Sequence, residues 1–500
     1  MRSITLETKQ RGLRWRSATA LAAGVLTALL GVSAPAHASP VVDATQQGSL
    51  TVHKFHKPDA ATGLPSNGAA VTSGLDGLTP LAGVEFTIEQ VNPVDLSSNT
   101  GWQAAEDVSK VFAPANPAGS ITSAASITLG TATTAVTDRT GSAVFSNLDL
   151  GLYLVTETSY PAGVTPAAPF LVTVPLTDPS QRDGWLYDVH VYPKNSVSTL
   201  SKTVTDNADA KVGDEIDFTI TGDIPNETVI DGYKIVDALD SKLKYVRADV
   251  TLTNGTSVTE GTHYTVVHDA ASNRVTVEFT APGRQVLAAN HTSEVQVILT
   301  AEVVAAGEIE NGALLYPNAP SFSVTPGDPN GPTPSPTVST KWGGLTVQKT
   351  DVAGAALAGA KFSVFTSQAD AVAGSNAVPL DGQTVFTTAA DGTLTLSGLR
   401  YSDWADGKEI TDTAAFQKYY LVEVQAPTGY ELLAQPIEFT VTAATTAAGV
   451  DLRVENVPSN GGFELPLTGG TGTALLYAGG ALLVGGAVVL FLNSRRRAKN

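Results

Sequence analysis

The sequence predicts an all-β protein made of tandem β-sandwich domains. Most of the chain consists of short runs rich in Val, Thr, Ile and Tyr, in which apolar and polar residues alternate. Turn signals such as Asn254-Gly255 and Asp391-Gly392 separate these runs, and no helical period interrupts them. Many short strands with this punctuation are typical of Ig-like sandwiches.

An internal repeat shows that one type of domain occurs twice, at about residues 45–195 and 343–458. The region from 197 to about 320 lacks the repeated pattern, so we expect a different sandwich there. The matching pairs are 49–54 (SLTVHK) with 344–349 (GLTVQK), 81–86 (LAGVEF) with 357–362 (LAGAKF), and 153–157 (YLVTE) with 419–423 (YYLVE).

The N-terminus has the pattern of a secretory signal peptide. Arg11, Arg14 and Arg16 precede an apolar stretch at 18–32, and the small residues around His37 offer a cleavage site. We therefore expect the mature chain to begin near Ser39. The predicted parts are a signal peptide (1–38), an N-terminal Ig-like domain (39–196), a middle Ig-like domain (197–322), an extended Pro-rich linker (323–342), a C-terminal domain of the repeated type (343–458) and a C-terminal segment (459–500).

Composition excludes several classes of function. The formal net charge is −18, and an acidic surface cannot neutralise phosphates, so nucleic acid is not an expected partner. The chain has no cysteine, although secreted domains commonly rely on disulfides, so it must be stabilised in another way. The seven histidines form no metal-ligand cluster, and no Ser/His/Asp set or phosphate loop is present. We predict no metal, no cofactor and no turnover enzyme.

Strand phase places charged side chains on apolar faces. Because side chains in a strand alternate with period two, each copy of the repeated domain puts a Lys, a Glu and an Asn on the apolar faces of three strands. The sets are Lys54, Glu157 and Asn195 in the first domain, and Lys349, Glu423 and Asn456 in the third.

The middle domain offers a variant of the same set. Lys202 and Asp237 lie on the apolar faces of their strands, with Asp in place of Glu. Its closing strand has two asparagines of opposite phase; Asn311 fits the apolar set better, and Asn318 is the alternative.

Burial gives these sets a possible chemistry. A dry core favours neutral lysine and a protonated acid. A neutral amine beside an Asn carboxamide, with an acid to move protons, can form an amide and release ammonia. Such a cross-link would tie the first and last strands of a domain and replace the missing disulfides. The alternative is a buried ion pair with Asn as a hydrogen-bond partner.

The C-terminus has three elements in a fixed order. The pentapeptide LPLTG is followed by an apolar run at 474–492, which is long enough to span a bilayer, and then by Arg495-Arg496-Arg497. The arginines would hold that end in the cytoplasm. The pentapeptide consists of Leu465, Pro466, Leu467, Thr468 and Gly469.

Together these residues resemble the backbone (major) pilins of Gram-positive sortase-assembled pili, most closely the actinobacterial fimbrial shaft subunits. Residues 192–195 (YPKN) resemble the pilin motif, and residues 419–430 resemble the E-box, with Val424 where the family usually has Thr. LPLTG resembles the sorting signal. The Lys/acid/Asn sets resemble the family's isopeptide triads, in which Glu423, Asp237 and Glu157 would be the acids.

The resemblance implies Cna-type Ig-like domains and a covalent fibre. A pilus-specific sortase would cleave after Thr468, and Lys194 of an identical subunit would attack the resulting thioester. Strand phase supports this role, because Lys194 points away from the core while Asn195 points into it. The position of Asn195 beside this lysine leaves open whether the first-domain bond forms before assembly.

The same resemblance implies where the protein acts and with which partners. The C-terminal helix would hold the chain in the membrane transiently, a tip adhesin would complete the fibre, and a housekeeping sortase would attach it to peptidoglycan. The protein would be a secreted, wall-anchored fimbrial subunit that supports adhesion. The competing interpretation is a monomeric wall-anchored adhesin in which YPKN has no role.

Overall fold

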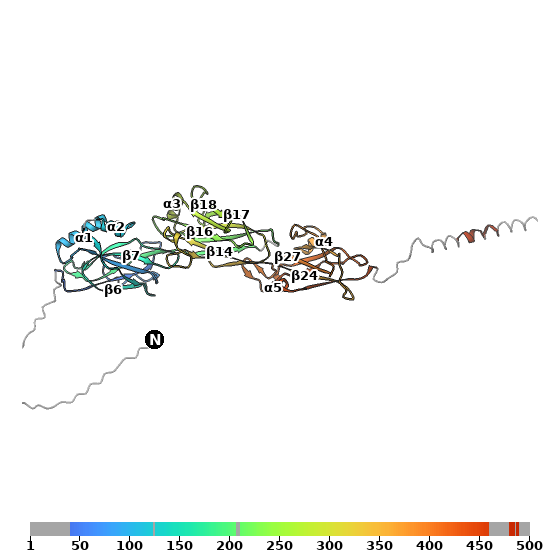
Figure 1. The fold of residues 1–500 in the computed structure, drawn as a ribbon, viewed down its shortest axis with the longest axis horizontal. Coiled ribbons are helices and arrows are strands. Elements are labelled where there is room, and N and C mark those ends of the chain that lie inside the picture. Colours follow the sequence, from blue (N-terminus) through green and yellow to red (C-terminus); the bar gives the residue numbers. More distant parts are fainter. Residues whose placement is uncertain (1–40, 124–125, 207–210, 460–479, 486, 490–500) are drawn as a thin grey trace, which may run out of the picture.

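The structure is a computed structural model that describes residues 41–123, 126–206, 211–459, 480–485 and 487–489. It forms an elongated row of three β-rich domains, from the blue N-terminal domain to the orange C-terminal one (Figure 1). The expected signal peptide and the LPLTG pentapeptide lie outside the described residues. Among the residues described, no helix is both long and apolar enough to cross a bilayer.

The first domain packs two sheets around an apolar core that includes Leu50, Phe86 and Val155. One sheet has the order β12-β1-β6, and the facing sheet has the order β4-β3-β7-β9 with β5 also paired to β3. The strands are β1 (Gly48–His53), β2 (Phe55–His56), β3 (Glu85–Asn92), β4 (Thr128–Leu129), β5 (Thr133–Val136), β6 (Ser142–Leu148), β7 (Gly151–Ser159), β8 (Val164–Thr165), β9 (Phe170–Val174), β10 (Leu176–Thr177), β11 (Trp185–Leu186), β12 (Asp188–Val191) and β13 (Lys194–Val197).

Two helices, α1 (Asn99–Val111) and α2 (Pro117–Thr122), cover the outer face of the second sheet, although the sequence analysis expected no helix here. Ser98 caps α1 by accepting a hydrogen bond from the Gly101 N–H, as N-cap serines commonly do. Ala105 and Val108 of α1 are buried one turn apart, which is the spacing of an amphipathic helix. The amphipathic pattern that predicts a helix is therefore present in the sequence, but only within this one insertion.

The middle domain faces a four-stranded sheet, β14-β15-β20-β17, against a five-stranded sheet, β18-β19-β16-β22-β23. Its core is the largest group of buried apolar residues that the structure describes, and Phe218, Val277 and Leu299 lie within it. The elements are β14 (Leu200–Thr205), β15 (Glu215–Asp223), β16 (Lys234–Ala238), β17 (Leu243–Leu252), β18 (Tyr264–Asp269), β19 (Arg274–Phe279), α3 (Ala281–Ala289), β20 (Glu294–Val303), β21 (Gly307–Asn311), β22 (Ala313–Tyr316), the 3₁₀ turn η1 (Pro320–Ser323) and β23 (Thr333–Pro334).

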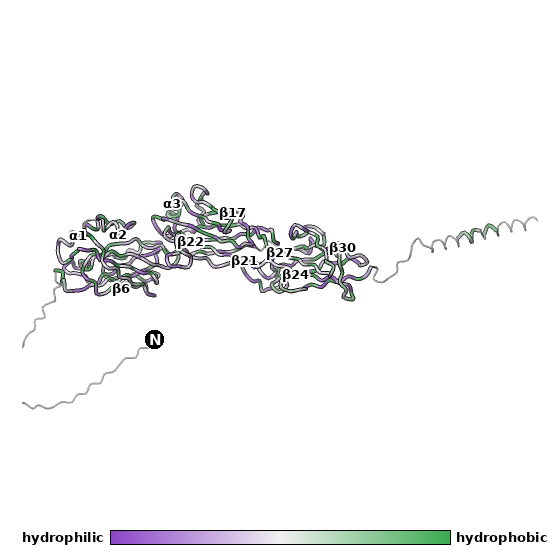
Figure 2. Tube along the Cα trace, in the orientation of Figure 1, coloured by the Kyte–Doolittle hydropathy of each residue, from purple (hydrophilic) through white to green (hydrophobic). Residues whose placement is uncertain are grey.

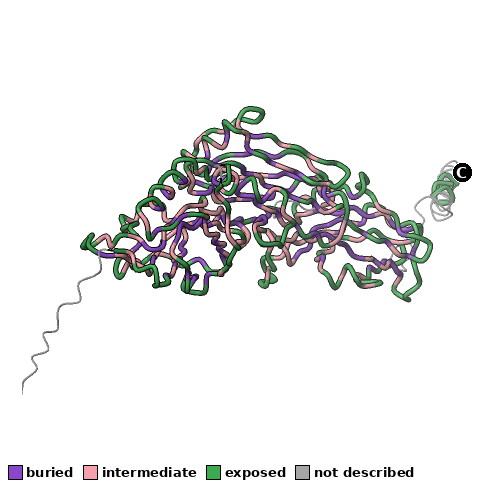
Figure 3. The backbone as a smooth tube through the Cα atoms, turned by 60° about the vertical axis from the view of Figure 1, so that its left-hand side comes forward, coloured by how far each residue is buried: buried purple, intermediate pink, exposed green. Residues whose placement is uncertain are grey.

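The third domain faces a sheet of β24, β27 and β32 against the sheet β26-β25-β30-β31, with Phe362 and Leu421 in the core between them. Hydrophilic and hydrophobic positions are interspersed along the strands of all three domains (Figure 2), and buried positions lie inside the domains (Figure 3). The elements are β24 (Val338–Asp351), β25 (Lys361–Phe365), α4 (Gln368–Ala373), β26 (Phe386–Thr387), β27 (Thr393–Arg400), β28 (Trp404–Ala405), β29 (Lys408–Glu409), η2 (Thr413–Ala415), β30 (Tyr419–Gln425), β31 (Ile437–Phe439), α5 (Ala443–Ala447) and β32 (Leu452–Asn456).

Strand β24 belongs to two domains. Its first part pairs with β21 of the middle domain, and its later part pairs with β27 and β32 of the third domain. The sequence analysis placed an extended linker at 323–342, but residues 333–334 pair with β22 and residues 338–342 pair with β21. The Pro- and Ser-rich composition suggested a free linker, whereas the alternation in 338–342 (VSTKW) suits a paired strand.

The middle domain also contacts the first domain through hydrogen bonds and an ion pair. The side-chain oxygen of Asn330 accepts a hydrogen bond from the Tyr160 N–H at 2.7 Å, and the Asn330 N–H donates to the Tyr160 carbonyl at 2.8 Å. Lys57 of the first domain pairs with Glu227 of the middle domain at 2.7 Å. These contacts fix the edge of the first domain that carries β8 and β13.

We expect Trp342→Ala to weaken the junction between the middle and third domains. Trp342 lies on β24 but is fully buried in the core of the middle domain. Truncation of a buried Trp costs about 3–5 kcal/mol. Calorimetry should show a lower unfolding temperature for the middle domain, with faster proteolysis around residues 323–342. Val267→Ala, at a site that is 59% exposed, is the control and should change little; equal effects of the two substitutions would contradict the assignment.

Candidate functional site

The first domain brings its predicted triad together in the core. The amine of Lys54 contacts Oε1 of Glu157 and donates a hydrogen bond to Oδ1 of Asn195 at 2.5 Å. Nδ2 of Asn195 donates to Oε2 of Glu157 at 2.6 Å. Lys54 directly follows β1, Glu157 lies on β7 and Asn195 lies on β13, so three strands converge on one point. One carboxylate oxygen of Glu157 thus contacts the Lys54 nitrogen, and the other contacts the side-chain nitrogen of Asn195.

Burial makes Lys54 a better nucleophile. Its side chain has no exposed surface. Removal from water lowers its pKa to about 8, even though the negative charge of Glu157 opposes that shift. The ring of Phe86, with its centroid 5.6 Å from the amine, supplies part of the apolar surroundings. The amine therefore has a much larger neutral fraction near neutral pH than an exposed lysine has.

The third domain repeats the arrangement. The amine of Lys349 contacts Oδ1 of Asn456 and lies 3.7 Å from Oε1 of Glu423. Nδ2 of Asn456 donates to both carboxylate oxygens of Glu423, at 2.9 and 3.0 Å. Lys349 and Asn456 lie on the parallel neighbours β24 and β32, two positions apart in register. Loss of water contact lowers the pKa of Lys349 as well.

The middle domain holds a buried ion pair between Lys202 and Asp237. Desolvation lowers the pKa of Lys202 and raises that of Asp237, while their mutual attraction opposes both shifts. Asn311 lies close enough to Asp237 to act against the rise in its pKa. Even so, within the described residues neither polar atom of the Asn311 side chain has a hydrogen-bond partner of normal geometry, and Oδ1 of Asp237 has none either.

The alternative asparagine, Asn318, is used elsewhere. Its Nδ2 donates to the Val164 carbonyl in the first domain at 3.1 Å, and its Oδ1 accepts from the Ser321 N–H at 3.0 Å. The structure thus brings Asn311 to the Lys202–Asp237 pair and places Asn318 at the domain boundary.

Lys194 lies at the start of β13, after a break in the closing strand at Tyr192-Pro193. Its neighbour Asn195 is fully buried, as the strand phase predicted. Lys194 itself is half-buried rather than fully exposed, and its amine donates to the Tyr192 carbonyl at 3.2 Å. Partial burial lowers its pKa.

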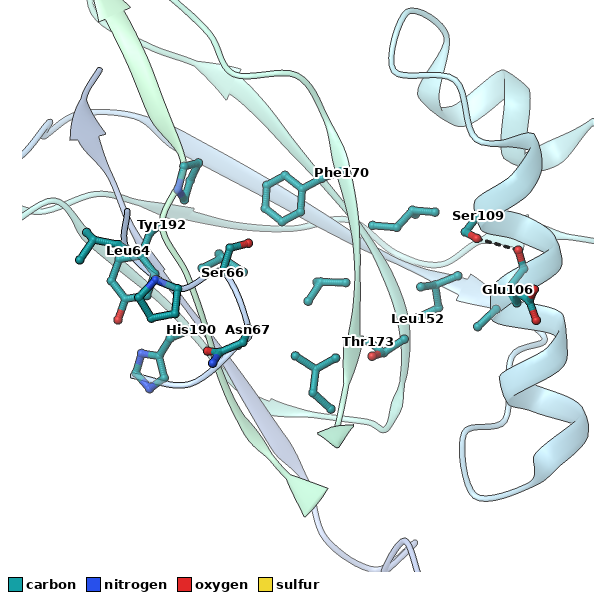
Figure 4. A pocket seen from close by; sticks show the side chains of 18 of the residues that line it. Leu64, Ser66, Asn67, Glu106, Ser109, Leu152, Phe170, Thr173, His190 and Tyr192 are labelled. Atoms are coloured by element: carbon teal, nitrogen blue, oxygen red, sulfur yellow. Dashed lines mark hydrogen bonds between the residues drawn. The ribbon is translucent and has the colours of Figure 1, made fainter. Parts of the chain in front are cut away.

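A cavity of about 760 Å³ opens beside Lys194. It lies between α1 and the segment that carries Tyr192, and its lining includes the apolar side chains of Trp102 and Phe170. Figure 4 shows Glu106 and Ser109 of α1 on one side and Tyr192 on the other. Lys194 is part of the wall, so a chain segment bound in this cavity could reach the amine.

Sequence reasoning missed an aromatic stack next to this cavity. Nε2 of His53 lies 2.9 Å from Nδ1 of His190, and the His53 ring stacks on Tyr192 with centroids 4.7 Å apart. Burial, with a smaller effect from His190, lowers the pKa of His53. The parallel pairing of β1 with β12 puts His53 and His190 near one another, and strand phase alone does not reveal which strands are neighbours.

Comparison with known proteins identifies the family. Two relatives match over nearly the whole length: the fimbrial subunit type 1 of Actinomyces viscosus (34% identity over 538 residues, covering 97% of this chain and 98% of the relative) and the fimbrial subunit type 2 of Actinomyces naeslundii (34% over 529 residues, covering 96% and 97%). The chain belongs to the Gram-positive pilins. The matching domain families are Gram-positive pilin subunit D1, N-terminal domain (45–196), the Sgo0707 N2 domain (196–314), the prealbumin-like fold domain (343–456) and the LPXTG cell wall anchor motif (457–500).

Solved pilin structures agree with this assignment. The full-length major pilin SpaD of Corynebacterium diphtheriae matches with a TM-score of 0.65 and 30% identity, covering 84% of this chain and 99% of that one. FimP of Actinomyces oris matches with a TM-score of 0.54 and 29% identity, covering 84% and 99%. The major pilin SpaA of C. diphtheriae matches with a TM-score of 0.58 and 26% identity, covering 82% and 100%.

The expectations on family, fold and location are confirmed. This pilin is a mostly β shaft subunit of a sortase-assembled pilus, and it is secreted and anchored to the cell wall. It is a sortase substrate in a structural family.

The depressed pKa of Lys54 predicts a pH dependence for a chain that cannot cross-link its first domain. Burial lowers the pKa of Lys54 to about 8 in the folded chain, against about 10.4 for an unfolded lysine. We expect Asn195→Ala to keep this amine buried beside Glu157, so the unfolded state should bind more protons between these values. Stability should therefore rise by up to about 3 kcal/mol between pH 8 and pH 10.4, measured by urea unfolding of the first domain. The double variant Lys54→Met, Asn195→Ala lacks the titrating amine and should not show this gain. Parallel pH profiles for the two proteins would show that Lys54 is not the cause.

Proposed function

We propose that this pilin polymerises through a bond between the Thr468 carbonyl of one subunit and the Lys194 amine of the next. The observation that carries the proposal is that Lys194 is one of the residues that line a largely apolar cavity. A pilus-specific sortase would cleave between Thr468 and Gly469 and hold Thr468 as a thioester. Attack by the neutral amine would form the amide, release the sortase thiol and transfer the fibre to the new subunit.

Lys194 is better suited to this attack than Lys110, an exposed lysine of the same domain. Partial desolvation lowers its pKa, which raises the neutral fraction of the amine. Lys110 of α1 is the opposite case, because hydrogen bonds to Asp107 and Glu106 on an exposed surface raise its pKa. The two amines lie in one domain, but only Lys194 lines the cavity.

The cavity has room for the end of the neighbouring chain. The folded part of the third domain is described to Ser459, and the residues from there to Thr468 can span about 30 Å when extended. In an extended chain Phe463, Leu465 and Leu467 point to one side, because they alternate with other residues. This apolar side matches the lining formed by Trp102 and other apolar residues.

We also propose an internal isopeptide bond in each domain: Lys54 to Asn195, Lys202 to Asn311, and Lys349 to Asn456. In each case the lysine nitrogen bonds to the asparagine carbonyl carbon, the bond from that carbon to Nδ2 breaks, and ammonia leaves. For the middle domain, the carboxamide of Asn311 and Oδ1 of Asp237, which have no hydrogen-bond partner among the described residues, favour Asn311 over Asn318. Buried polar groups without partners are costly, and an amide at this point would supply a donor for Asp237.

In this proposal the protein is a substrate and a self-modifying scaffold rather than a turnover enzyme. The fibre is a homopolymer with a separate adhesin at its tip. The membrane holds each subunit only until the sortase acts, and a housekeeping sortase joins the completed fibre to peptidoglycan.

The Lys194→Ala variant should abolish polymerisation. Immunoblots of SDS-boiled wall extracts should show a high-mass ladder for the wild-type chain and only monomer for the variant. Lys110→Ala removes a lysine from the same domain and should keep the ladder. A persistent ladder in Lys194→Ala would assign the linkage to another lysine, and monomer alone in the wild type would favour a wall-anchored adhesin.

Lys349→Ala should remove one cross-link. After correction for the substitution, the intact mass of the mature chain should show one ammonia loss fewer than in the wild type. Because a covalent tie of this kind is comparable to a disulfide, worth about 2–5 kcal/mol, the unfolding temperature of the third domain should fall by about 10–20 °C. Lys418→Ala, at an exposed lysine of the same domain, is the control. An unchanged ammonia deficit in Lys349→Ala would mean that its triad is only an ion pair.

A further inference from the structure

One hydrogen bond sets the triad of the first domain apart from the other two. In the first domain, the backbone N–H of Ala167 donates to Oδ1 of Asn195 at 2.7 Å. In the third domain the nearby backbone donor, the Leu433 N–H, instead binds Oε2 of Glu423 at 3.0 Å. In the middle domain Oδ1 of Asn311 has no partner within the described chain. A backbone donor on the asparagine oxygen is thus particular to the first domain among these described sites.

We propose that the Ala167 N–H is the oxyanion donor for bond formation between Lys54 and Asn195, an inference that rests on the internal cross-link proposed above. When the lysine nitrogen adds to Cγ of Asn195, negative charge develops on Oδ1. A donor at 2.7 Å lies within the range at which preorganised N–H groups stabilise such charge. The Lys54 amine must leave Oδ1 as it approaches the carbon, so the Ala167 N–H is the donor that stays on the oxygen.

Glu157 contacts both nitrogens between which a proton must move. Its Oε1 contacts the attacking nitrogen, and its Oε2 accepts from the leaving nitrogen at 2.6 Å. Glu157, as the carboxylate, takes one proton from the Lys54 nitrogen after that nitrogen has added to Cγ, and the resulting carboxylic acid donates the same proton to Nδ2 of Asn195. The bond from Cγ to Nδ2 then breaks and ammonia leaves, so the products are one amide, one ammonia molecule and an unchanged Glu157.

The fold holds this donor in place from two sides. Strand β8 pairs antiparallel with β13, with Thr165 opposite Ser196, so the residues after Thr165 run past Asn195. Pro166 restricts the backbone directly before Ala167. From the middle domain, Nδ2 of Asn318 donates to the Val164 carbonyl at 3.1 Å and to the Thr165 hydroxyl at 3.2 Å. The donor therefore belongs to a segment that is fixed before any reaction takes place.

The decisive test replaces the residue 167 amide by an ester in the full-length mature chain, using the hydroxy-acid analogue of alanine. This change exchanges N–H for O and keeps the side chain. After a pulse of cell-free synthesis, peptide mass spectrometry follows ammonia loss from the Lys54–Asn195 pair and from the Lys349–Asn456 pair. We expect the first rate to fall by about a hundredfold and the second to stay at the wild-type value.

Two further samples make the result unambiguous. Ala167→Pro also removes the N–H and should slow the first-domain bond, whereas Ala168→Pro removes an N–H for which the described chain offers no acceptor and should not. A wild-type rate in the ester variant would overturn the role of Ala167 while leaving the cross-link intact. A wild-type chain without any Lys54–Asn195 cross-link would instead show that the first-domain bond itself, and with it this inference, is wrong.

Discussion

The removal of a lysine amine from water is the constraint on which this pilin depends. Lys54, Lys202 and Lys349 lie in dry sandwich cores, where the ammonium form loses its hydration and the neutral amine becomes accessible. The cost is tolerable only because each amine meets a carboxylate, and the proposed cross-links also require an asparagine near each pair. Three strands must therefore be in register before any chemistry can occur. The proposed cross-links could therefore form only in a domain that has folded correctly.

Strand phase predicted which charged and polar side chains share the inner faces of the sandwiches. Period-two alternation put Lys349, Glu423 and Asn456 on inner faces, and the internal repeat turned one ambiguous set into two matching ones. Phase cannot give the pairing order of strands, so it did not reveal that His53 lies against His190. It favoured Asn311 but left Asn318 as an alternative, because the position of Asn318 depends on how two domains dock.

The largest departures from expectation lie where local composition and tertiary pairing conflict. The Pro- and Ser-rich region before the third domain suggested a free tether, yet β24 begins inside it, because backbone groups buried at a domain junction need partners. Strand phase indicated only that Lys194 points away from the core, whereas the structure places it in a cavity wall formed partly by α1, a helix in an insertion that carries no strand signal. Because α1 belongs to a single insertion, it hardly changes the alternation of apolar and polar residues that dominates the chain.

The entry point of the linkage also determines which parts of the molecule feel tension. If the neighbouring subunit pulls on Lys194, the force enters the chain at residue 194. Residues 41–193, which make up most of the first domain, then lie outside the part of the chain that carries tension. With the proposed bonds in place, force crosses directly from Lys202 to Asn311 and from Lys349 to Asn456, bypassing the chain between them. Only the stretches 194–202, 311–349 and 456–468 can then lengthen, and β24 occupies part of the longest one. A fibre built this way would extend very little under load. The first domain would carry no tension, so its surface would be available for contacts with other molecules.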